Sequence, residues 1–149
     1  MSGLTQPANF PAAAEWLGKA AAQGDAQAQH MLALLQIRGS GVRHDRDAAL
    51  GWLRKSHAQK YESSAAVLGA LLVERASTAE ETAEGITILR EAGRKHDELA
   101  LMTLARLSEM GRGVPQDLAQ AVSYYEQAAA MGSKQAPIAL AKLRERSAK

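Results

Sequence analysis

Apolar and small residues recur every 36 residues along this chain, and no insertion interrupts the series. One set of positions holds leucines, and a second set holds pairs with an aromatic or aliphatic residue. These positions are Leu32, Leu68, Leu104 and Leu140, and Trp16-Leu17, Trp52-Leu53, Ile88-Leu89 and Tyr124-Tyr125. A fixed period of this length is typical of repeat proteins in which each repeat is one supersecondary unit. We expect the aromatic residues of the second set to pack in the core between helices.

Each period contains two stretches of helical pattern, separated by glycine, proline or polar residues. They predict eight helices, at about 10–23, 26–38, 46–59, 62–75, 81–94, 98–110, 118–131 and 134–146. A polar residue that can accept hydrogen bonds from free backbone N–H groups precedes most of these stretches. The expected N-cap residues are Asn9, Asp25, Asp45, Asp97, Asp117 and Ser133. Thr78 and Glu81 have the spacing of a capping box.

Short helices with one apolar stripe each must stack to bury that stripe, which is the physical basis of a helical solenoid. We therefore predict an all-α fold, an α-α superhelix formed as a right-handed solenoid of about four helix pairs. The chain is expected to form a single domain over residues 1–149. The predicted repeat units are approximately 12–24 (partial), 25–60, 61–96, 97–132 and 133–149 (partial).

Composition agrees with a helical core and excludes several classes of site. Hydrophobic residues make up 46% of the chain but aromatic residues only 4%, so helix-favouring alanine and leucine must build the core. The absence of cysteine excludes disulfides, thiol nucleophiles and cysteine-bound zinc. A formal net charge of +2 is too small to predict nucleic-acid binding. No apolar run approaches the ~18 residues of a membrane span, so we expect a cytoplasmic protein, or a periplasmic or secreted one if a signal peptide has been removed.

Two periods resemble the Sel-one-like repeat, a relative of the tetratricopeptide repeat. That pattern has an alanine, a leucine-glycine pair, a G-x-G-V turn with an aspartate, and then an alanine, an aromatic pair and Ala-Ala-x-x-Gly. The first complete period, residues 25–60, contains Ala28, Leu32-Ala33, Gly39-Ser40-Gly41-Val42, Asp45, Ala49, Trp52-Leu53 and Lys55-Ser56. The third reads Ala100, Leu104-Ala105, Gly111-Arg112-Gly113-Val114, Asp117, Ala121, Tyr124-Tyr125, Ala128-Ala129 and Gly132. The resemblance covers roughly residues 12–143.

The second period departs from this pattern at its turns. Arg75, Ser77 and Thr78 stand where the first period has glycine, glycine and valine, and Lys60 and His96 stand at positions of turn glycines. Because the length of the period is preserved, we expect the turn to survive with an altered conformation. The resemblance implies a role in protein interaction, as an adaptor, co-chaperone or scaffold or, in bacteria, as an inhibitor that neutralises a toxin.

No constellation of residues points to catalysis, a metal or a cofactor. The four histidines, His30, His44, His57 and His96, are dispersed, and no two of them have the i, i+4 spacing of a helical metal site. No nucleophile elbow with a neighbouring strand pattern is present, so no catalytic residue is expected. The basic residues near the C-terminus are expected to form a solvated end rather than a nucleic-acid site.

One helix face in each period has no structural role in this scheme. At 100° per residue, Ala28, Leu32 and Leu35 define the buried face of the helix at 26–38, and other residues point away from it. In tetratricopeptide-like stacks, this opposite side lines a concave groove. The 36-residue period then gives the candidate protein-binding residues His30, Leu34, Ile37, Arg38, Val73, Leu99, Met102, Arg106, Met110, Ile138 and Lys142.

This face is more apolar than a solvated helix face, and Arg38, Arg106 and Lys142 frame it. We therefore predict an adaptor or scaffold that binds a protein or peptide segment with apolar and acidic character. One alternative function is a bacterial immunity or inhibitor protein that occludes a toxin or effector enzyme. Self-association through the apolar groove is another use of the same surface. The structural alternative is that neighbouring repeats bury these side chains. No nucleic acid and no membrane insertion are expected.

Overall fold

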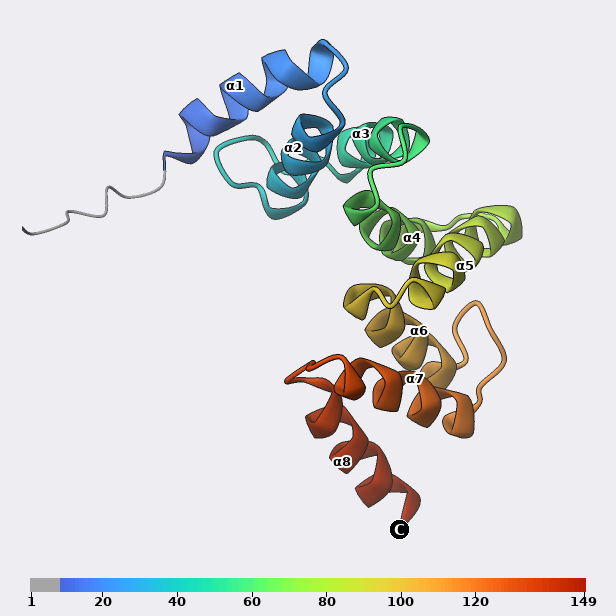
Figure 1. Ribbon diagram of the computed structural model, residues 1–149. Coiled ribbons are helices and arrows are strands. Elements are labelled where there is room, and N and C mark those ends of the chain that lie inside the picture. Colours follow the sequence, from blue (N-terminus) through green and yellow to red (C-terminus); the bar gives the residue numbers. More distant parts are fainter. Residues whose placement is uncertain (1–8) are drawn as a thin grey trace, which may run out of the picture. The chain divides into compact units, whose positions relative to one another are not determined.

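A computed structural model describes residues 9–149, and these residues form eight α-helices without a strand (Figure 1). The helices are α1 (Phe10–Ala22), α2 (Ala26–Arg38), α3 (Arg46–Ala58), α4 (Ser63–Arg75), α5 (Ala79–Arg94), α6 (Glu98–Met110), α7 (Leu118–Ala130) and α8 (Ala136–Ser147). Each helix begins and ends within two residues of the predicted bounds. The prediction of an all-α repeat fold is confirmed.

Polar caps begin the helices where the sequence predicted them. The N-cap aspartates accept a hydrogen bond from the backbone N–H three residues later, at 2.8–3.0 Å. They are Asp25, Asp45, Asp97 and Asp117, and Asn9 makes the same bond at 3.1 Å. Ser133 is not the N-cap of α8, because this helix begins later, at Ala136. The Ser133 hydroxyl accepts a hydrogen bond from the N–H of Ala136 at 3.3 Å.

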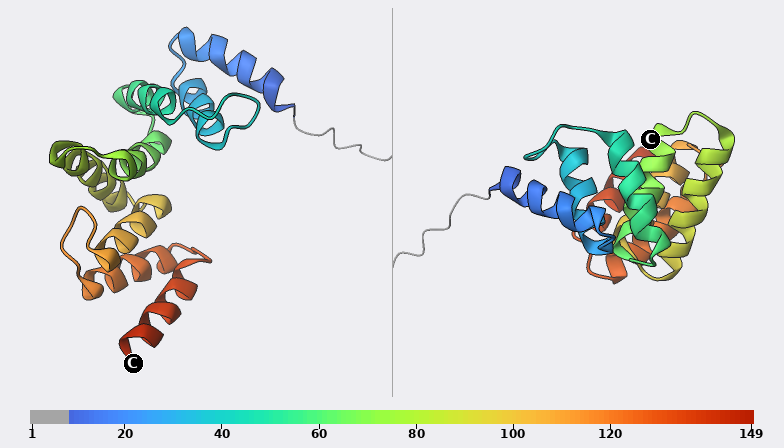
Figure 2. Two further views of the ribbon diagram at one scale, coloured as in Figure 1. Left: turned by 180° about the vertical axis from the view of Figure 1, so that it is seen from behind. Right: turned by 90° about the horizontal axis from the view of Figure 1, so that it is seen from above.

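The described residues form two compact units, which divide after Ser64. In the first unit, α2 packs against α1 and, more extensively, against α3. In the second unit, α6 packs against α5 and, more extensively, against α7, which in turn packs against α8. Figures 1 and 2 show the antiparallel pairs α2–α3 and α6–α7 lying side by side.

The second repeat differs from the others at the turn between α4 and α5, as its sequence predicted. In the first and third repeats a left-handed glycine follows the first helix, with φ values of 70° and 69°. In the second repeat, α4 ends at Arg75, and α5 begins soon afterwards, at Ala79. The Thr78 hydroxyl accepts the N–H of Glu81 at 3.1 Å, and the Glu81 carboxylate reaches back to the N–H of Ser77 at 2.8 Å. As a result α5 has 16 residues, whereas α3 and α7 have 13.

Lys60 and His96 adopt the left-handed backbone conformation of the glycines that they replace. Both have a φ of 62°, a region that is unfavourable for residues with a Cβ. Both side chains are exposed. The chain therefore keeps the same turn at these helix ends with a less suitable residue.

The aromatic positions of the repeat are not all buried. Tyr125 is 2% exposed, and Trp52 packs against the cluster formed by Ala21, Ala28 and Leu32. Trp16, expected in the core, is 73% exposed. The reason is positional, because Trp52 covers the two helices before its own, and no helix precedes α1 among the described residues.

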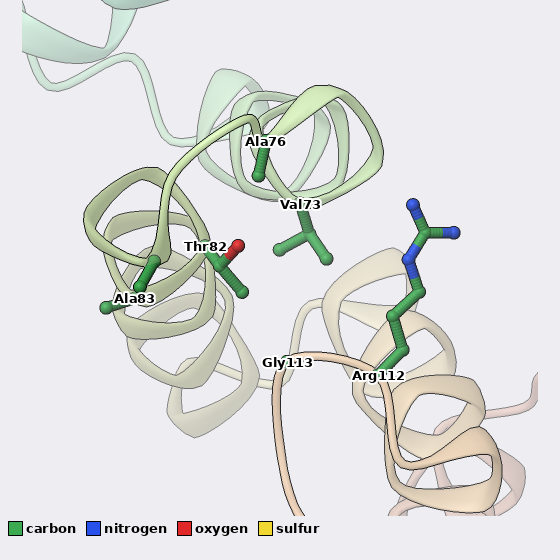
Figure 3. A pocket seen from close by; sticks show the side chains of 7 residues that line it. Val73, Ala76, Thr82, Ala83, Arg112 and Gly113 are labelled. Atoms are coloured by element: carbon green, nitrogen blue, oxygen red, sulfur yellow. The ribbon is translucent and has the colours of Figure 1, made fainter.

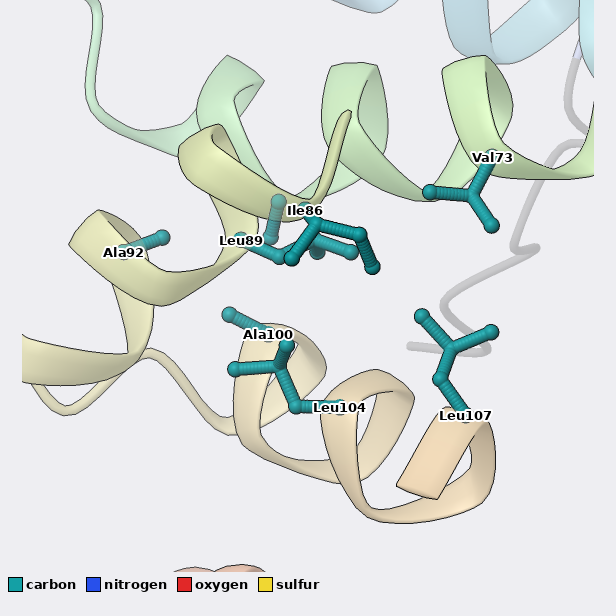
Figure 4. Close-up of a cluster of buried hydrophobic side chains, with 8 residues drawn as sticks. Val73, Ile86, Leu89, Ala92, Ala100, Leu104 and Leu107 are labelled. Carbon is teal, nitrogen blue, oxygen red and sulfur yellow. The ribbon is translucent and has the colours of Figure 1, made fainter. Parts of the chain in front are cut away.

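Helices α4, α5 and α6 share one hydrophobic cluster (Figure 4). Its buried residues are Ala66, Val73, Ile86, Leu89, Ala92, Ala100, Leu104 and Leu107. Two glycines bring α4 and α5 together. A Cβ on Gly85 would stand 2.8 Å from the carbonyl oxygen of Gly69, and a Cβ on Gly69 would stand 2.9 Å from the carbonyl oxygen of Gly85. The core of this unit therefore depends on the absence of side chains at two helical positions.

Within residues 9–149, no helix combines the length and apolarity that crossing a bilayer requires. The cytoplasmic location and the single domain remain predictions.

We expect Gly85→Ala to lower the unfolding midpoint, because its methyl group must displace the backbone of α4. Overpacking of this kind costs typically ~1–3 kcal/mol. The matched control is Gly51→Ala in α3, where a Cβ meets nothing within 4 Å. That variant should gain up to ~1 kcal/mol from helix propensity alone. Urea or thermal unfolding measures both, and equal stabilisation of the two variants would contradict the close contact.

Candidate functional site

In the first unit, the structure buries much of the predicted groove face. The predicted groove residues of α2 are His30, Leu34, Ile37 and Arg38. His30 is only 8% exposed, Leu34 and Ile37 are half-buried, and Arg38 is exposed. The expected outward orientation of His30 is therefore corrected. Residues that follow α3 cover its ring, because Tyr61 lies beside it with a distance of 5.4 Å between ring centroids.

His30 ends a buried chain of hydrogen bonds. The Ser56 hydroxyl donates to the carbonyl oxygen of Ala26 at 2.7 Å, and the Ser64 hydroxyl donates to the Ser56 oxygen at 2.7 Å. Each hydroxyl has one proton, so the Ser64 oxygen must accept from Nδ1 of His30, which lies 2.9 Å away. Nδ1 therefore carries the proton of the neutral ring. Burial lowers the pKa of His30 from its ordinary value of 6.5.

This histidine–serine pair is arranged for structure rather than for nucleophilic catalysis. A general base must accept the hydroxyl proton, whereas Nδ1 of His30 donates to Ser64. Both Ser56 and Ser64 are 0% exposed, so neither hydroxyl can meet a substrate. Sequence analysis missed the network, although a signal was present: both serines occupy positions at which the other repeats have alanine.

A second pair of polar side chains closes the same region. The Gln59 amide donates to the side-chain oxygen of Gln29 at 3.0 Å, and the Gln29 amide donates to the carbonyl oxygen of Ala21 at 3.2 Å. Gln29 is 3% exposed. The helices of the first unit are therefore joined by directional bonds as well as by apolar contacts.

In the second unit, the predicted residues divide between core and surface. Val73 is 5% exposed and belongs to the cluster of α4, α5 and α6, so its expected outward orientation is also corrected. Met102 is half-buried and packs against buried residues of α6, α7 and α8. The exposed members are Leu99 (43%), Met110 (61%) and Ile138 (56%), together with Arg106 and Lys142.

Four of these residues form one stripe along α6. Leu99, Met102, Arg106 and Met110 follow i, i+3, i+7 and i+11 spacing, which places them on one helix face. We call this set the α6 stripe. Ile138 and Lys142 occupy the equivalent face of α8, which shares two hydrophobic clusters with α6.

Exposed cations lie on the α6 stripe and on the equivalent face of α8, where the exposed acid Glu145 follows Lys142 by three residues. Glu109 forms an ion pair with Arg146 and accepts a hydrogen bond from the Tyr125 hydroxyl at 2.9 Å. Burial raises the pKa of Tyr125, so the phenol keeps the proton that it donates. Arg106 and Lys142 make no ion pair with any described residue. The only half-buried acid on this side is thus neutralised, and two exposed cations are available to a partner.

A cleft of about 410 Å³ lies beyond the end of α4 (Figure 3). Its walls are Val73, Ala76, Ala79, Thr82, Ala83, Arg112 and Gly113. The additional turn of α5 supplies Ala79, and the loop after α6 lies against α5 at Gly113 (φ 73°), where a Cβ would stand 2.7 Å from the Thr82 methyl group. Arg112 donates to the carbonyl oxygen of Glu74 at 3.2 Å. The walls present methyl groups and a single cation, too few polar groups to orient a specific ligand.

The described residues contain no group of three or more histidine, aspartate or glutamate side chains that could hold a metal ion. The histidines do not form a metal site together. His30 belongs to the buried hydrogen-bond network, and His44 and His96 are exposed in separate turns.

Comparison with known proteins identifies a repeat family. A family model described as Sel1 repeat matches residues 1–25, 26–60 and 99–133. The unmatched stretch between the last two segments contains α4, α5 and the altered turn. No curated protein matches the chain.

Solved structures of three bacterial proteins are similar to this one. A protective antigen of uropathogenic Escherichia coli strains, which displays an SLR fold, is 31% identical with a TM-score of 0.78, and the match covers 95% of this chain and 30% of that chain. A Sel1 repeat protein from Oxalobacter formigenes is 28% identical with a TM-score of 0.73, covering 89% and 54%. Cysteine rich protein B of Helicobacter pylori is 18% identical with a TM-score of 0.58, covering 85% and 91%, which shows the fold alone. This chain spans about a third of the first protein and about half of the second.

The buried network predicts acid sensitivity. Because the pKa of His30 is lower in the folded state than in the unfolded state, its contribution to stability is complete above pH ~6.5 and is lost as the pH falls through the folded pKa. We expect the unfolding midpoint to fall between pH 7.5 and 5, and His30→Gln to reduce that dependence. His44→Gln, in an exposed turn, is the control and should leave it unchanged. In an NMR titration, the pKa of His30 should lie below its ordinary value of 6.5, and a pKa at or above 6.5 would contradict the network.

Proposed function

Because the chain belongs to the Sel1 repeat family, we propose that it is a protein-interaction module in which the α6 stripe binds an apolar segment of a partner. Sel1 repeats are helical scaffolds that generally mediate protein binding. The proposed role is binding rather than catalysis, in keeping with the inaccessible hydroxyls of Ser56 and Ser64.

The observation that carries the proposal is the exposure of large apolar side chains along one helix face. Leu99 and Met110 are 43% and 61% exposed at opposite ends of the stripe, and Met102 lies between them. An isolated exposed apolar residue needs no explanation, but several apolar residues on one helix face, here with Arg106 between Met102 and Met110, are typical of an interaction surface. A partner helix or extended segment would bury it by presenting apolar residues at matching intervals.

The exposed cations on these two helices support an acidic character for the partner. Arg106 lies within the stripe and Lys142 lies on the equivalent face of α8, and both are exposed without an ion pair. Acidic residues beside the apolar positions of a partner would meet these cations. Such pairs at the rim of an interface accelerate association more than they strengthen the final complex.

Synthetic peptides test this chemistry directly. We propose three amphipathic peptides with the same apolar residues, flanked by glutamate, glutamine or lysine, whose binding is followed by fluorescence anisotropy. The glutamate peptide should bind most tightly, with an affinity that decreases as salt is added, and the lysine peptide least tightly. Equal binding of all three peptides would contradict the role of Arg106 and Lys142.

Matched substitutions locate the site. Leu99→Glu should lower the affinity for the glutamate peptide at least about tenfold, a loss of ~1.4 kcal/mol, and should leave the unfolding midpoint nearly unchanged because the residue is exposed. Leu104→Glu is the control for folding, since Leu104 is 2% exposed and a buried carboxylate should unfold the unit. Met102→Glu is a poorer probe, because Met102 contacts the core. A folded Leu99→Glu variant with full affinity would place the site elsewhere.

A further inference from the structure

Sulfur is present in this chain only as methionine, because the sequence contains five methionines and no cysteine. Thioethers are therefore the side chains that a mild two-electron oxidant attacks. All the methionines except Met1 lie within residues 9–149, where the structure describes their exposure. Two of them, Met102 and Met110, belong to the α6 stripe. The proposed binding surface is thus also a place where oxidisable sulfur gathers.

The two methionines of the stripe differ in their access to solvent. Met110 is the last residue of α6 and is 61% exposed, more than Met31 (44%) or Met131 (41%). Met102 is half-buried and packs against buried residues of α6, α7 and α8. Because the oxidant must reach the sulfur atom, the rate of oxidation follows exposure. Met110 should therefore react first among these four methionines, and Met102 last.

We propose that a peroxide oxidises Met110 to the sulfoxide and thereby lowers the affinity of the α6 stripe for its partner, an inference that rests on the proposed function. The sulfur lone pair attacks one oxygen of hydrogen peroxide, and an S–O bond forms as the O–O bond breaks. The remaining proton moves to the departing hydroxide, which leaves as water. Sulfur loses two electrons and the peroxide gains them. Two thiols reverse the step, yielding the thioether, a disulfide and water.

A sulfoxide oxygen on Met110 opposes contact with an apolar partner. Oxidation converts a flexible apolar side chain into a polar one that accepts hydrogen bonds. An apolar side chain of the partner that covers Met110 would remove this oxygen from water, and burying a polar group without a hydrogen bond is unfavourable. Leu99, at the opposite end of the stripe, has no sulfur and keeps its apolar surface. Oxidation should therefore weaken binding rather than abolish it.

Arg106 offers the new oxygen a donor in the unbound protein. It lies four residues before Met110 on the same helix face, and residues at this spacing are neighbours on a helix surface. The Arg106 guanidinium is exposed, and its N–H groups can donate to a sulfoxide oxygen. Such a bond would stabilise the oxidised side chain on α6 and compete with an acidic residue of the partner. Oxidation of Met110 should thus leave the fold intact and reduce the preference for an acidic peptide.

Oxidation of Met102 should have a different consequence. Its side chain packs against the cluster that includes Ala128 and Ala136, both 0% exposed. A sulfoxide oxygen at this position would meet apolar neighbours, which lowers the stability of the fold. Mild oxidation, which reaches Met110, should therefore lower affinity alone, and stronger oxidation, which reaches Met102, should also lower the unfolding midpoint.

Peptide mapping after peroxide treatment tests the order of oxidation. The chain is incubated with increasing hydrogen peroxide, the excess is removed with catalase, and mass spectrometry measures the sulfoxide at each methionine. Among the methionines of residues 9–149, Met110 should be oxidised at the lowest dose and Met102 at the highest. Oxidation of Met102 at the same dose as Met110, or of Met31 before Met110, would overturn the assignment of Met110 as the reactive site.

Anisotropy with the glutamate peptide, made without methionine, tests the effect on binding. At the dose that oxidises Met110 but not Met102, the affinity of the unmodified chain should fall about tenfold, with an unchanged unfolding midpoint. Met110→Leu should keep after treatment whatever affinity it has before, because leucine has no sulfur. Met31→Leu in α2 is the matched control and should lose affinity as the unmodified chain does. Full affinity of the oxidised unmodified chain, or an equal loss in Met110→Leu, would overturn the role of Met110.

The untreated chain separates this inference from the proposed function. If the untreated chain does not bind the peptide, the proposed function is wrong, and the effect of Met110 oxidation on binding is wrong with it. If the untreated chain binds and oxidation leaves its affinity unchanged, only the modification is overturned. Incubation of the oxidised chain with a methionine sulfoxide reductase and dithiothreitol should restore the affinity. An affinity that stays low after the map shows Met110 reduced would overturn the reversible modification.

Discussion

Close approach of neighbouring helices through small residues is the constraint on which this structure depends. Helices of about 13 residues have too little apolar surface to fold alone, so each must bury its stripe against its neighbours in the chain. Alanines at the centre of α2–α3 and α6–α7, and the glycine pair between α4 and α5, permit this contact. Leucines such as Leu53, Leu68 and Leu89 then fill the space between the helices. The scarcity of aromatic residues follows from the same requirement.

The periodic sequence predicted the helices well because repeat, cap and helical pattern all indicated the same bounds. The four aspartate caps and the Thr78–Glu81 capping box reflect local chemistry, which a sequence shows directly, although α5 begins at Ala79 and not at the predicted residue 81. The altered turn between α4 and α5 was also predicted, because the sequence has no glycine there at the positions where the other repeats have left-handed glycines. Agreement at several levels is what makes a local prediction reliable.

The candidate surface was predicted only in part, and the failures share one cause. Periodicity shows which face of a helix points away from the other helix of its repeat. It does not show whether residues of the next repeat cover that face. His30 is buried beneath the residues between α3 and α4, and Val73 lies between α4, α5 and α6, whereas Leu99 of the same predicted set is exposed. Trp16 is the converse case, since it has the residue type of the core but no helix before it among residues 9–149 to cover it.

The buried hydroxyl chain gives the repeats an order. Modules built mostly from alanine and leucine contacts are nearly interchangeable, so a chain of them can pair in shifted registers, with one module in the place of another. Ser56 and Ser64 oppose such exchange, because a shift by one period would set buried hydroxyls against the alanines found at these positions in the other repeats. A buried hydroxyl without a hydrogen-bond partner costs ~1–3 kcal/mol. In the correct register, both serine hydroxyls have a partner, and this cost does not arise. The polar network thus makes the junction of α2, α3 and the start of α4 chemically different from the corresponding junctions of the other repeats.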